Sequence, residues 1–378
     1  MIDALHSVVD WGVTGLLAWL FVITVVVFFH ELGHFSMGRF FGVRVETFSI
    51  GFGPEIFGWT DKKGTRWKVS WIPLGGYVKY WGDADATSRP DYEKVQEMSP
   101  EEHSQSLLAK PVYQRALISA AGPFANFILA IVIYMALFMA FGRVVVPPVI
   151  GSVTPGGAAQ MAGIKAGDVV RSINGTEITS YDQLLPIIGT SAGDDLAITL
   201  ERGGSLLTIH ATPRLVRRAD QLGYIENIPT LGVTSSATAK PRIVRYGPIS
   251  AFGQSVRQTW GLITGTLKGL GQIISGRADP SQLRGPLGTA DLAKKVAGLG
   301  FLALIELAAF MSVSIGLVNL FPIPVLDGGH LLYYGCEAVL GRPLGERAQE
   351  VGFRFGLVLV LGLLLFATWN DLTRSNHF

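Results

Sequence analysis

Four long apolar runs, separated by polar segments, dominate the hydrophobic pattern of this chain. The clearest run extends from residue 116 to 142 without a charged side chain and lies between Arg115 and Arg143. A run of about 20 apolar residues is long enough to cross a ~30 Å hydrocarbon core as a helix. The pattern therefore predicts membrane-spanning helices at about residues 11–38, 116–142, 303–321 and 353–371.

The distribution of basic residues predicts the orientation of these spans. No Lys or Arg precedes the first span, whereas Arg39 and Arg44 follow it closely. Cytoplasmic loops of membrane proteins carry an excess of Lys and Arg. We therefore expect both termini and residues from 143 to about 300 to lie outside, and residues 39–115 to lie in the cytoplasm. The missing basic residues also argue against a cleavable signal peptide.

Residues 43–82 alternate apolar and polar positions and are rich in aromatic residues, as in FSIGFGPEIFGW and WKVSWIPLGGYVKYWG. Alternation interrupted by Gly and Pro predicts short strands and hairpins. Because this segment follows a membrane span, we expect a membrane-associated β-hairpin region. A small cytoplasmic subdomain that touches nothing is the alternative. The acidic, polar stretch from 83 to 106 is typical of a solvated loop.

Residues 148–233 contain short strand-like runs between Gly, Pro and Asn turns, with helical segments around 158–162 and 181–188. The segment AGIKAGDVVRSING resembles the signature of α+β PDZ domains in bacterial envelope proteases. Such domains bind an extended chain by strand addition, next to a loop that holds a C-terminal carboxylate. The resemblance assigns this loop to Leu231, Gly232 and Val233. An occluded groove that only limits access to the membrane part is the alternative.

The fold class expected from these patterns is an α-helical membrane protein with an inserted PDZ domain. Residues 248–275 carry apolar positions at helical spacing, which predicts an amphipathic helix on the membrane surface, with a plain linker helix as the alternative. The expected organisation is a first half of the membrane core (1–147), the PDZ domain (148–233), a linker with the surface helix (234–300) and a second half of the core (301–378).

Composition excludes several classes of protein. Apolar residues make up 49% of the 378 residues and charged residues 16%, which excludes a disordered chain. The 31 Lys and Arg residues nearly balance 29 Asp and Glu residues, so nothing favours a nucleic acid as partner. Cys336 is the single cysteine of the sequence, so the chain has no intrachain disulfide.

The chemistry is concentrated in the sequence His-Glu-Leu-Gly-His at residues 30–34, inside the first predicted span. On a helix, residues i and i+4 share one face, so His30 and His34 can bind one metal ion while Glu31 lies beside it. Zinc accepts such ligands, and a nearby carboxylate can act as general base. Two packed structural histidines are the alternative. Ionisable groups inside an apolar span are costly unless they are paired, metal-bound or hydrated, which favours a functional site.

A third metal ligand is expected near the end of the third span, in the sequence NLFPIPVLDGGH at residues 319–330. The two prolines break the helix, and irregular backbone at membrane depth survives only inside protein or beside a hydrated cavity. Asp327 has a suitable carboxylate, and the glycines after it allow close approach of the backbone. His330 is an alternative ligand by residue type, and the spacing leaves the choice open.

Taken together, HELGH in the first span, N-x-x-P-x-P-x-L-D-G-G in a later one and a PDZ-like region between them resemble the site-2 protease family of intramembrane zinc metalloproteases. The likeness is closest to its bacterial branch, the regulator of sigma-E proteases. The segments GFGP (51–54), IPLGGYVK (72–79), GPFAN (122–126) and GPLG (285–288) also match that family. The resemblance implies one Zn²⁺ per chain, bound by His30, His34 and Asp327, with Glu31 as catalytic base.

The resemblance also implies how substrate is held. It assigns substrate binding to Asn319, Pro322, Pro324, Gly75, Gly76 and Tyr77. The expected function is cleavage within transmembrane segments of single-span proteins, during regulated intramembrane proteolysis in the bacterial inner membrane. By the same likeness, the substrates are an anti-sigma factor trimmed by another protease, in a stress response, and remnant signal peptides. The active site is expected toward the cytoplasm.

Two points about this resemblance remain open. Enterobacterial members of the branch carry two tandem PDZ domains, whereas residues 148–233 have room for one. This difference concerns gating, for which we favour a size filter over a specific carboxylate reader. A non-catalytic membrane PDZ adaptor that binds protein termini is the alternative function, although the intact Glu31, both histidines and Asp327 argue against it.

Overall fold

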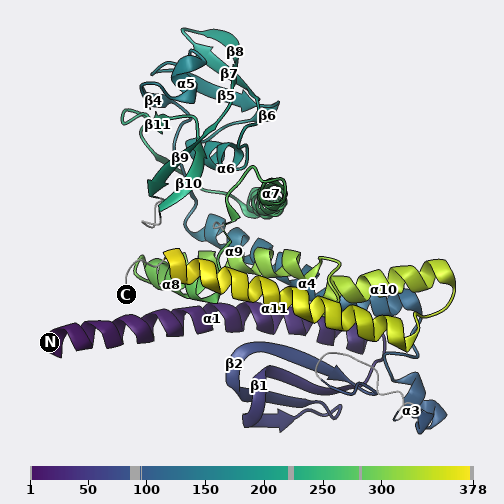
Figure 1. Cartoon of the computed structure of the whole chain (residues 1–378). Coiled ribbons are helices and arrows are strands. Elements are labelled where there is room, and N and C mark those ends of the chain that lie inside the picture. The colour runs from purple at the N-terminus through teal and green to yellow at the C-terminus, as the bar shows by residue number, and fades with distance from the viewer. Residues whose placement is uncertain (1, 86–93, 95, 220–224, 281–282, 375–378) are drawn as a thin grey trace. The chain divides into compact units, whose positions relative to one another are not determined.

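The computed structural model describes residues 2–85, 94, 96–219, 225–280 and 283–374. The chain divides into two compact units. One unit contains the chain up to Ile133 together with Gly285–Trp369, and the other contains Tyr134–Arg284 and the residues from Asn370 onward. Figure 1 shows the course of the chain through its helices and small sheets. Each unit is described by itself.

The four apolar runs form four long helices, as predicted from the hydrophobic pattern. These are α1 (Ile2–Phe40), α4 (Val112–Ala140), α9 (Phe301–Asn319) and α11 (Glu346–Arg374). Their parts that are long and apolar enough to cross a membrane are Thr14–Phe40, Val112–Ala140, Phe301–Asn319 and Arg347–Thr373. These limits differ from the predicted ones by a few residues, and the chain is a multi-pass membrane protein.

The apolar side chains of α11 point mostly outward. Only 6% of its apolar window is buried inside the protein, and Val358 and Leu365 are about 70% exposed. Such a surface would be a large apolar patch in water, whereas in lipid it has a matching solvent. The apolar composition of α11 is therefore explained by contact with the hydrocarbon of a membrane and not by burial inside the protein.

Helix α1 is anchored by small residues at its crossing points. Ala18 and Val22 pack against Ala293 of α8 (Pro286–Ala297) and against Ala308 of α9. The indole nitrogen of Trp19 donates a hydrogen bond to Thr289 Oγ1 (3.2 Å). Helix α8 lies in the segment that the sequence assigned to a linker, so this part of the linker is helical and belongs to the membrane unit.

The strand-rich segment predicted at 43–82 forms an antiparallel pair, β1 (Val45–Thr60) and β2 (Arg66–Tyr80). Both strands fold back on themselves. Ile50 of β1 pairs with Val69 on one side and with Gly76 on the other, and Val69 of β2 pairs with both Ile50 and Phe57. Residues 76–80 therefore form an edge with β1 on one side, and within the described chain no other strand pairs with this sheet. Membrane contact of the hairpin stays a prediction, and α3 (Pro100–Ser104) lies in the expected loop.

A small core fixes the hairpin to the membrane helices. Phe48 is 1% exposed and packs edge-on against Phe35 of α1 and stacks on Trp67. The Tyr80 hydroxyl donates a hydrogen bond to the main-chain oxygen of His34 (2.9 Å). Because His34 belongs to the predicted metal-binding turn, this contact sets the hairpin in register with that turn.

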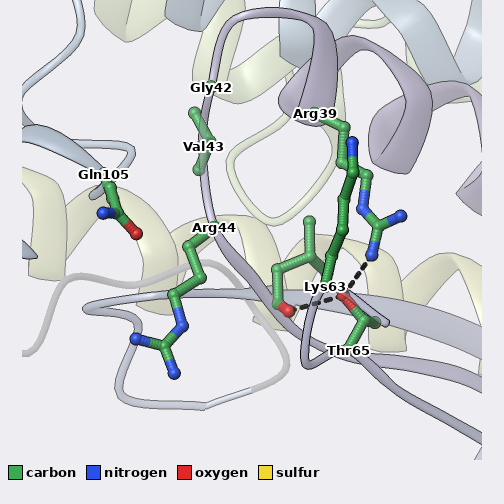
Figure 2. A pocket seen from close by; sticks show the side chains of 8 residues that line it. Arg39, Gly42, Val43, Arg44, Lys63, Thr65 and Gln105 are labelled. Atoms are coloured by element: carbon green, nitrogen blue, oxygen red, sulfur yellow. Dashed lines mark hydrogen bonds between the residues drawn. The ribbon is translucent and has the colours of Figure 1, made fainter. Parts of the chain in front are cut away.

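A cavity of about 370 Å³ lies where the hairpin meets the end of α1, with Arg39, Arg44 and Lys63 among its lining residues (Figure 2). Arg39 donates to Thr65 Oγ1 and forms an ion pair with Asp61. Burial raises the pKa of Asp61, but hydrogen bonds from Trp67, Thr65 and Arg39 outweigh it and bring this pKa down to about 2. The ion pair therefore holds the hairpin turn against the helix end over the whole physiological pH range.

The second unit contains the segment expected to be a PDZ domain. Its four-stranded sheet has the order β6-β5-β7-β8, formed by Thr176–Glu177, Val169–Ile173, Leu196–Arg202 and Ser205–Ala211. Strand β4 (Ile150–Val153) pairs with β11 (Val233–Ser235). The helical segments expected around 158–162 and 181–188 are confirmed as α5 (Ala158–Met161), a 3₁₀ turn (Tyr181–Gln183) and α6 (Leu184–Gly189). The PDZ assignment itself stays a prediction.

The remaining elements of this unit are two short strand pairs and one long helix. The pairs are β3 (Arg143–Val145) with β12 (Arg242–Val244), and β9 (Arg214–Ala219) with β10 (Ile225–Thr230). Helix α7 (Pro248–Ile274) confirms the helix predicted at 248–275. Its polar side bonds to the 190–194 loop through Gln272 and Lys268, and its other side exposes Phe252 and Trp260. The helix thus has one polar and one apolar side, and its place on the membrane surface stays a prediction.

Candidate metal centre

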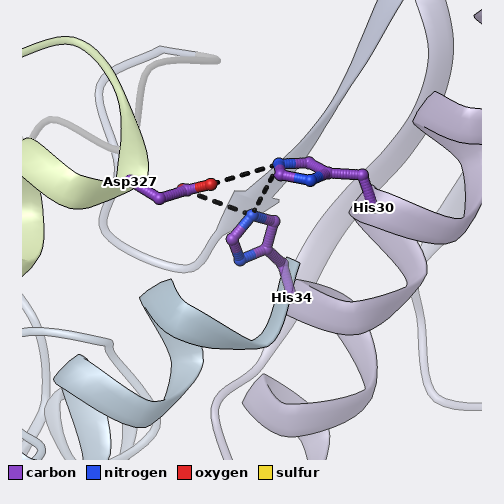
Figure 3. A group of neighbouring side chains, drawn as sticks. All are labelled: His30, His34 and Asp327. Atoms are coloured by element: carbon purple, nitrogen blue, oxygen red, sulfur yellow. Dashed lines mark hydrogen bonds and ion pairs between the residues drawn. The ribbon is translucent and has the colours of Figure 1, made fainter. Parts of the chain in front are cut away.

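The two histidines of the HELGH sequence lie one turn apart on α1 and point the same way (Figure 3). Their Nε2 atoms are 3.2 Å apart, and their ring centroids are 4.8 Å apart. His30 is 8% exposed. The helical geometry expected from the i, i+4 spacing therefore brings both imidazoles to one point.

The third member of the cluster is Asp327, the first residue of α10 (Asp327–Leu340). Its Oδ2 atom lies 3.1 Å from His30 Nε2, and its Oδ1 atom lies 3.3 Å from His34 Nε2. Figure 3 shows the carboxylate approaching the two rings from a separate segment of the chain. Helix α10 was not predicted, because the sequence analysis expected helices in the second half of the core only at about 303–321 and 353–371.

The backbone before α10 explains why Asp327 reaches the histidines. A β-carbon on Gly328 would lie 2.2 Å from the Phe321 carbonyl oxygen, and one on Gly329 would lie 2.5 Å from that of Ile323. The turn can close this tightly only with glycine at both positions. Val325 adopts a positive φ of 95°, which shows that the turn is constrained.

The residues present fit a zinc ion. Asp327 Oδ2 is buried and has no hydrogen-bond partner among the described residues, which is costly for a carboxylate unless a cation binds it. Metal–ligand bonds of about 2.0–2.1 Å at tetrahedral angles separate neighbouring ligand atoms by roughly 3.3 Å. The Nε2 atoms of His30 and His34, at 3.2 Å, are close to this value, and each faces a different carboxylate oxygen of Asp327. One ligand atom from each of the three residues lies within 4.8 Å of the other two. Two imidazoles and one carboxylate leave a fourth position for water.

A second cavity, which contains the metal cluster, is lined by most of the site residues predicted from the sequence. It has a volume of about 390 Å³ and is lined, among others, by His30, Glu31, His34, Gly75, Gly76, Tyr77, Asn319, Asp327 and His330. His330 is thus close to the cluster without being one of its three converging ligands. The spacing had left His330 open as a ligand, and the geometry favours Asp327.

Pro322 and Pro324 are not among the residues that line this cavity. Pro322 is exposed, and Pro324 packs against α11, where a β-carbon on Gly356 would lie 1.9 Å from the Pro324 carbonyl oxygen. Both prolines belong to the turn that carries Asp327, and their contact with substrate stays a prediction.

Glu31 faces the edge strand of the hairpin. A β-carbon on Gly76 would lie 3.1 Å from Glu31 Cγ and 2.7 Å from the Ser49 carbonyl oxygen. The strand therefore runs directly past the expected catalytic base.

Contacts that the sequence did not reveal hold the site together. Arg115 of α4 donates to both carboxylate oxygens of Glu337 on α10 (2.6 and 3.0 Å), and both side chains are largely buried. A buried bidentate pair of this kind fixes geometry, here that of the helix carrying Asp327. His34 Nδ1 lies 2.9 Å from the Ile118 carbonyl oxygen. Charged residues at span ends were visible in the sequence, but their pairing was not.

The expected carboxylate loop, Leu231, Gly232 and Val233, lies in the second unit. Gly232 has a positive φ of 76°, and its carbonyl accepts a hydrogen bond from Thr154 N (2.7 Å). The Tyr181 hydroxyl donates to the carbonyl oxygen of Val233 (3.1 Å). The structure thus forms a tight loop at this place, with one carbonyl of the following strand already bonded by a side chain.

Comparison with known proteins agrees with this chemistry. The model of peptidase family M50 matches residues 18–363. The chain is 45% identical to "Putative zinc metalloprotease Atu1380" of Agrobacterium fabrum over 356 residues, which cover 94% of both chains. It is 38% identical to "Metalloprotease MmpA" of Caulobacter vibrioides over 385 residues, covering 96% of both chains. The region matched by the family model contains both the HELGH turn and the Asp327 turn.

The geometry predicts which side chains hold the metal. Replacing His30, His34 or Asp327 singly by Ala should reduce the zinc content of the purified protein to less than about one tenth, because three ligands are the minimum for a catalytic zinc site. Zinc per chain is measured by elemental analysis after removal of loosely bound metal.

The matched control is His330→Ala, which removes an imidazole from the same cavity. This variant should keep the zinc content of the unmodified protein. If His330→Ala loses zinc to the same extent as His30→Ala, the assignment of Asp327 as third ligand is wrong.

Proposed function

The chain belongs to peptidase family M50 and is a zinc metalloprotease, and from this premise we propose that it hydrolyses peptide bonds within transmembrane segments of single-span proteins. The observation that carries the proposal is the position of the metal cluster. His30 and His34 lie within Thr14–Phe40, a stretch of α1 that is long and apolar enough to cross a membrane. Ionisable groups at this depth are costly unless they are paired, bound to a metal or hydrated, and they therefore mark a functional site.

The proposed roles follow from the donor set and its surroundings. His30, His34 and Asp327 hold one zinc ion, which when bound acidifies a water molecule and polarises the peptide carbonyl. Glu31 lies beside the ligands and accepts the proton of the attacking water. It then delivers this proton to the nitrogen of the leaving amine, which becomes a neutral amine. Asn319 lines the same cavity and offers hydrogen bonds to the substrate backbone.

We propose that Gly75, Gly76 and Tyr77 begin a strand edge that captures the substrate. A substrate helix hides its carbonyls in internal hydrogen bonds, so it must unwind before hydrolysis. The amide of Tyr80 donates to Asp83 Oδ2 and therefore faces away from β1. Because successive N–H groups alternate between the two edges of a strand, those of Val78 and Gly76 also face away from β1. An extended substrate paired here would pass Glu31.

By the family resemblance, the enzyme acts in the bacterial inner membrane, with the HELGH end of α1 toward the cytoplasm. The relatives it matches are bacterial proteins, which supports this location. The substrate class is a single-span protein already trimmed by another protease, such as an anti-sigma factor, or a remnant signal peptide. Peptides of both kinds are therefore the substrates for the tests that follow.

The first test separates catalysis from binding. Glu31→Gln should keep the zinc content and lower the rate of cleavage by about 10²–10⁴-fold, because it removes the general base and leaves the ligands in place. Cleavage of a single-span peptide in lipid is followed by mass spectrometry. Glu306→Gln, which changes an exposed glutamate of α9, is the matched control and should cleave normally.

A different outcome of this test would favour the second function. If Glu31→Gln and the unmodified protein behave alike, with neither cutting the peptide while both bind protein termini, the chain is a membrane adaptor and the proposed hydrolase activity is wrong.

The second test concerns the strand edge. Val78→Pro removes an N–H that faces away from β1, and should lower cleavage at least about tenfold while zinc content is unchanged. Lys62→Pro is the control, because Lys62 occupies the second position of the Asp61–Gly64 turn, where proline is favoured. Equal cleavage rates for Val78→Pro and Lys62→Pro would exclude strand capture.

For residues 148–233 we propose a size filter that excludes substrates with bulky external domains. The Tyr181 hydroxyl already bonds the Val233 carbonyl, an atom that a PDZ ligand would need for strand pairing. The bond therefore disfavours a specific carboxylate reader, although Gly232 forms the expected loop.

The filter is tested by varying the substrate. A single-span peptide with a short external tail should be cut, and one with a folded external domain of about 100 residues should not. Amidation of the tail's C-terminus should leave the rate unchanged. A strong loss of cleavage on amidation would instead identify residues 231–233 as a carboxylate reader.

A further inference from the structure

Asn126 of α4 lies next to the metal cluster without belonging to it. Its side chain is fully buried, and its amide nitrogen is 3.2 Å from His30 Nδ1. Its Oδ1 atom has no hydrogen-bond partner within the part of the chain that the structure describes. A buried amide oxygen without a donor is costly, so this position requires a physical reason.

The chemistry of His30 supplies that reason. If Nε2 binds a metal ion, a neutral imidazole carries its proton on Nδ1, which is then a donor. Two donors cannot bond each other, so the NH₂ group of Asn126 cannot face this proton. Rotating the amide by 180° exchanges its oxygen and nitrogen with no change of shape. The oxygen that lacks a partner then accepts the proton that lacks an acceptor.

We propose that Asn126 is a positioning residue, whose Oδ1 accepts a hydrogen bond from His30 Nδ1 and so fixes the tautomer and ring plane of this ligand. The inference rests on the metal site proposed above. His34 provides a parallel, since its Nδ1 lies 2.9 Å from the Ile118 carbonyl oxygen. Helix α4 would then orient both histidines, one through its backbone and one through a side chain.

The surroundings of Asn126 show that it cannot easily move away. Ser312 of α9 donates a hydrogen bond to its main-chain oxygen (2.9 Å). Gly316, one turn further along α9, packs tightly on Asn126, because a β-carbon there would lie 3.1 Å from Asn126 Cβ. Asn126 is thus held between α9 and the His30 ring.

The expected effect is on metal affinity as well as on turnover. Partners of metal-bound histidines typically contribute roughly 10–100-fold to affinity. Asn126→Leu keeps a similar volume but removes the acceptor, and should weaken zinc binding by that factor. Asn126→Asp keeps an acceptor at the same place and should bind zinc at least as tightly as the unmodified protein.

The experiment uses the full chain in detergent. Zinc affinity is measured by competition with a chelator, and the ligand field by the visible absorption of the Co²⁺-loaded protein. Ser314→Ala is the matched control, because it removes a serine hydroxyl of the same helix that donates to the Phe310 carbonyl oxygen (3.1 Å), and it should leave affinity and spectrum unchanged. The melting temperature of each metal-free variant shows whether it is folded.

The outcomes are distinct. Unchanged zinc affinity in Asn126→Leu would overturn the inference, and so would an equal loss in Asn126→Leu and Asn126→Asp, since packing alone would then explain both. In either case the unmodified protein still binds zinc, and the metal site stands. Failure of the unmodified protein to bind zinc would instead overturn the proposed function.

Discussion

The structure depends on the meeting of two imidazoles and one carboxylate at membrane depth. A carboxylate in such a place is stable only with a cation or with enough hydrogen bonds, and Asp327 Oδ2 has no hydrogen-bond partner in the described chain. The cluster therefore gains stability from the ion that it binds. The HELGH turn, the glycine-tight turn before α10 and the helix that orients the histidines all serve to bring one ligand atom from each residue to within 4.8 Å of the other two.

Helix α4 has the central place in this arrangement. One face of it contacts the histidines of α1, at Ile118 and Asn126, and its first turns hold α10 through the Arg115–Glu337 pair. Close approach to α1 is possible because Gly33 and Gly122 lie at the crossing, where a β-carbon on Gly122 would lie 2.2 Å from His34 Nε2. Small residues at helix crossings are the usual means of close packing in membranes. Because His34 packs this closely on α4, its imidazole is held in one orientation.

Much of this could be predicted from the sequence, and the remainder has physical reasons. The spans followed from hydrophobic length, and the pairing of His30 with His34 followed from the i, i+4 rule, because both are local properties. The choice of Asp327 over His330 depended on how residues 320–326 turn, and the family resemblance, not the spacing, favoured it. Helices α8 and α10 were missed because both are too short to stand out as apolar spans, with 12 and 14 residues, and α10 begins at the Pro- and Gly-rich turn that was expected to be irregular. The buried partner of His30 was invisible, since it depends on how three helices pack.

Hydrolysis inside a membrane makes two demands, and the contact between Gly76 and Glu31 bears on both. The peptide must leave its helix before attack, and the base must lie beside the exposed carbonyl. If the capturing strand and the base belonged to independent parts, their register would vary by the few tenths of an ångström that decide proton transfer. Here Tyr80 bonds the backbone of His34 and Gly76 packs on Glu31, so strand and metal-binding turn are one unit. Under the proposed strand capture, a substrate paired with the strand would be delivered in register with the base, without a separate positioning step.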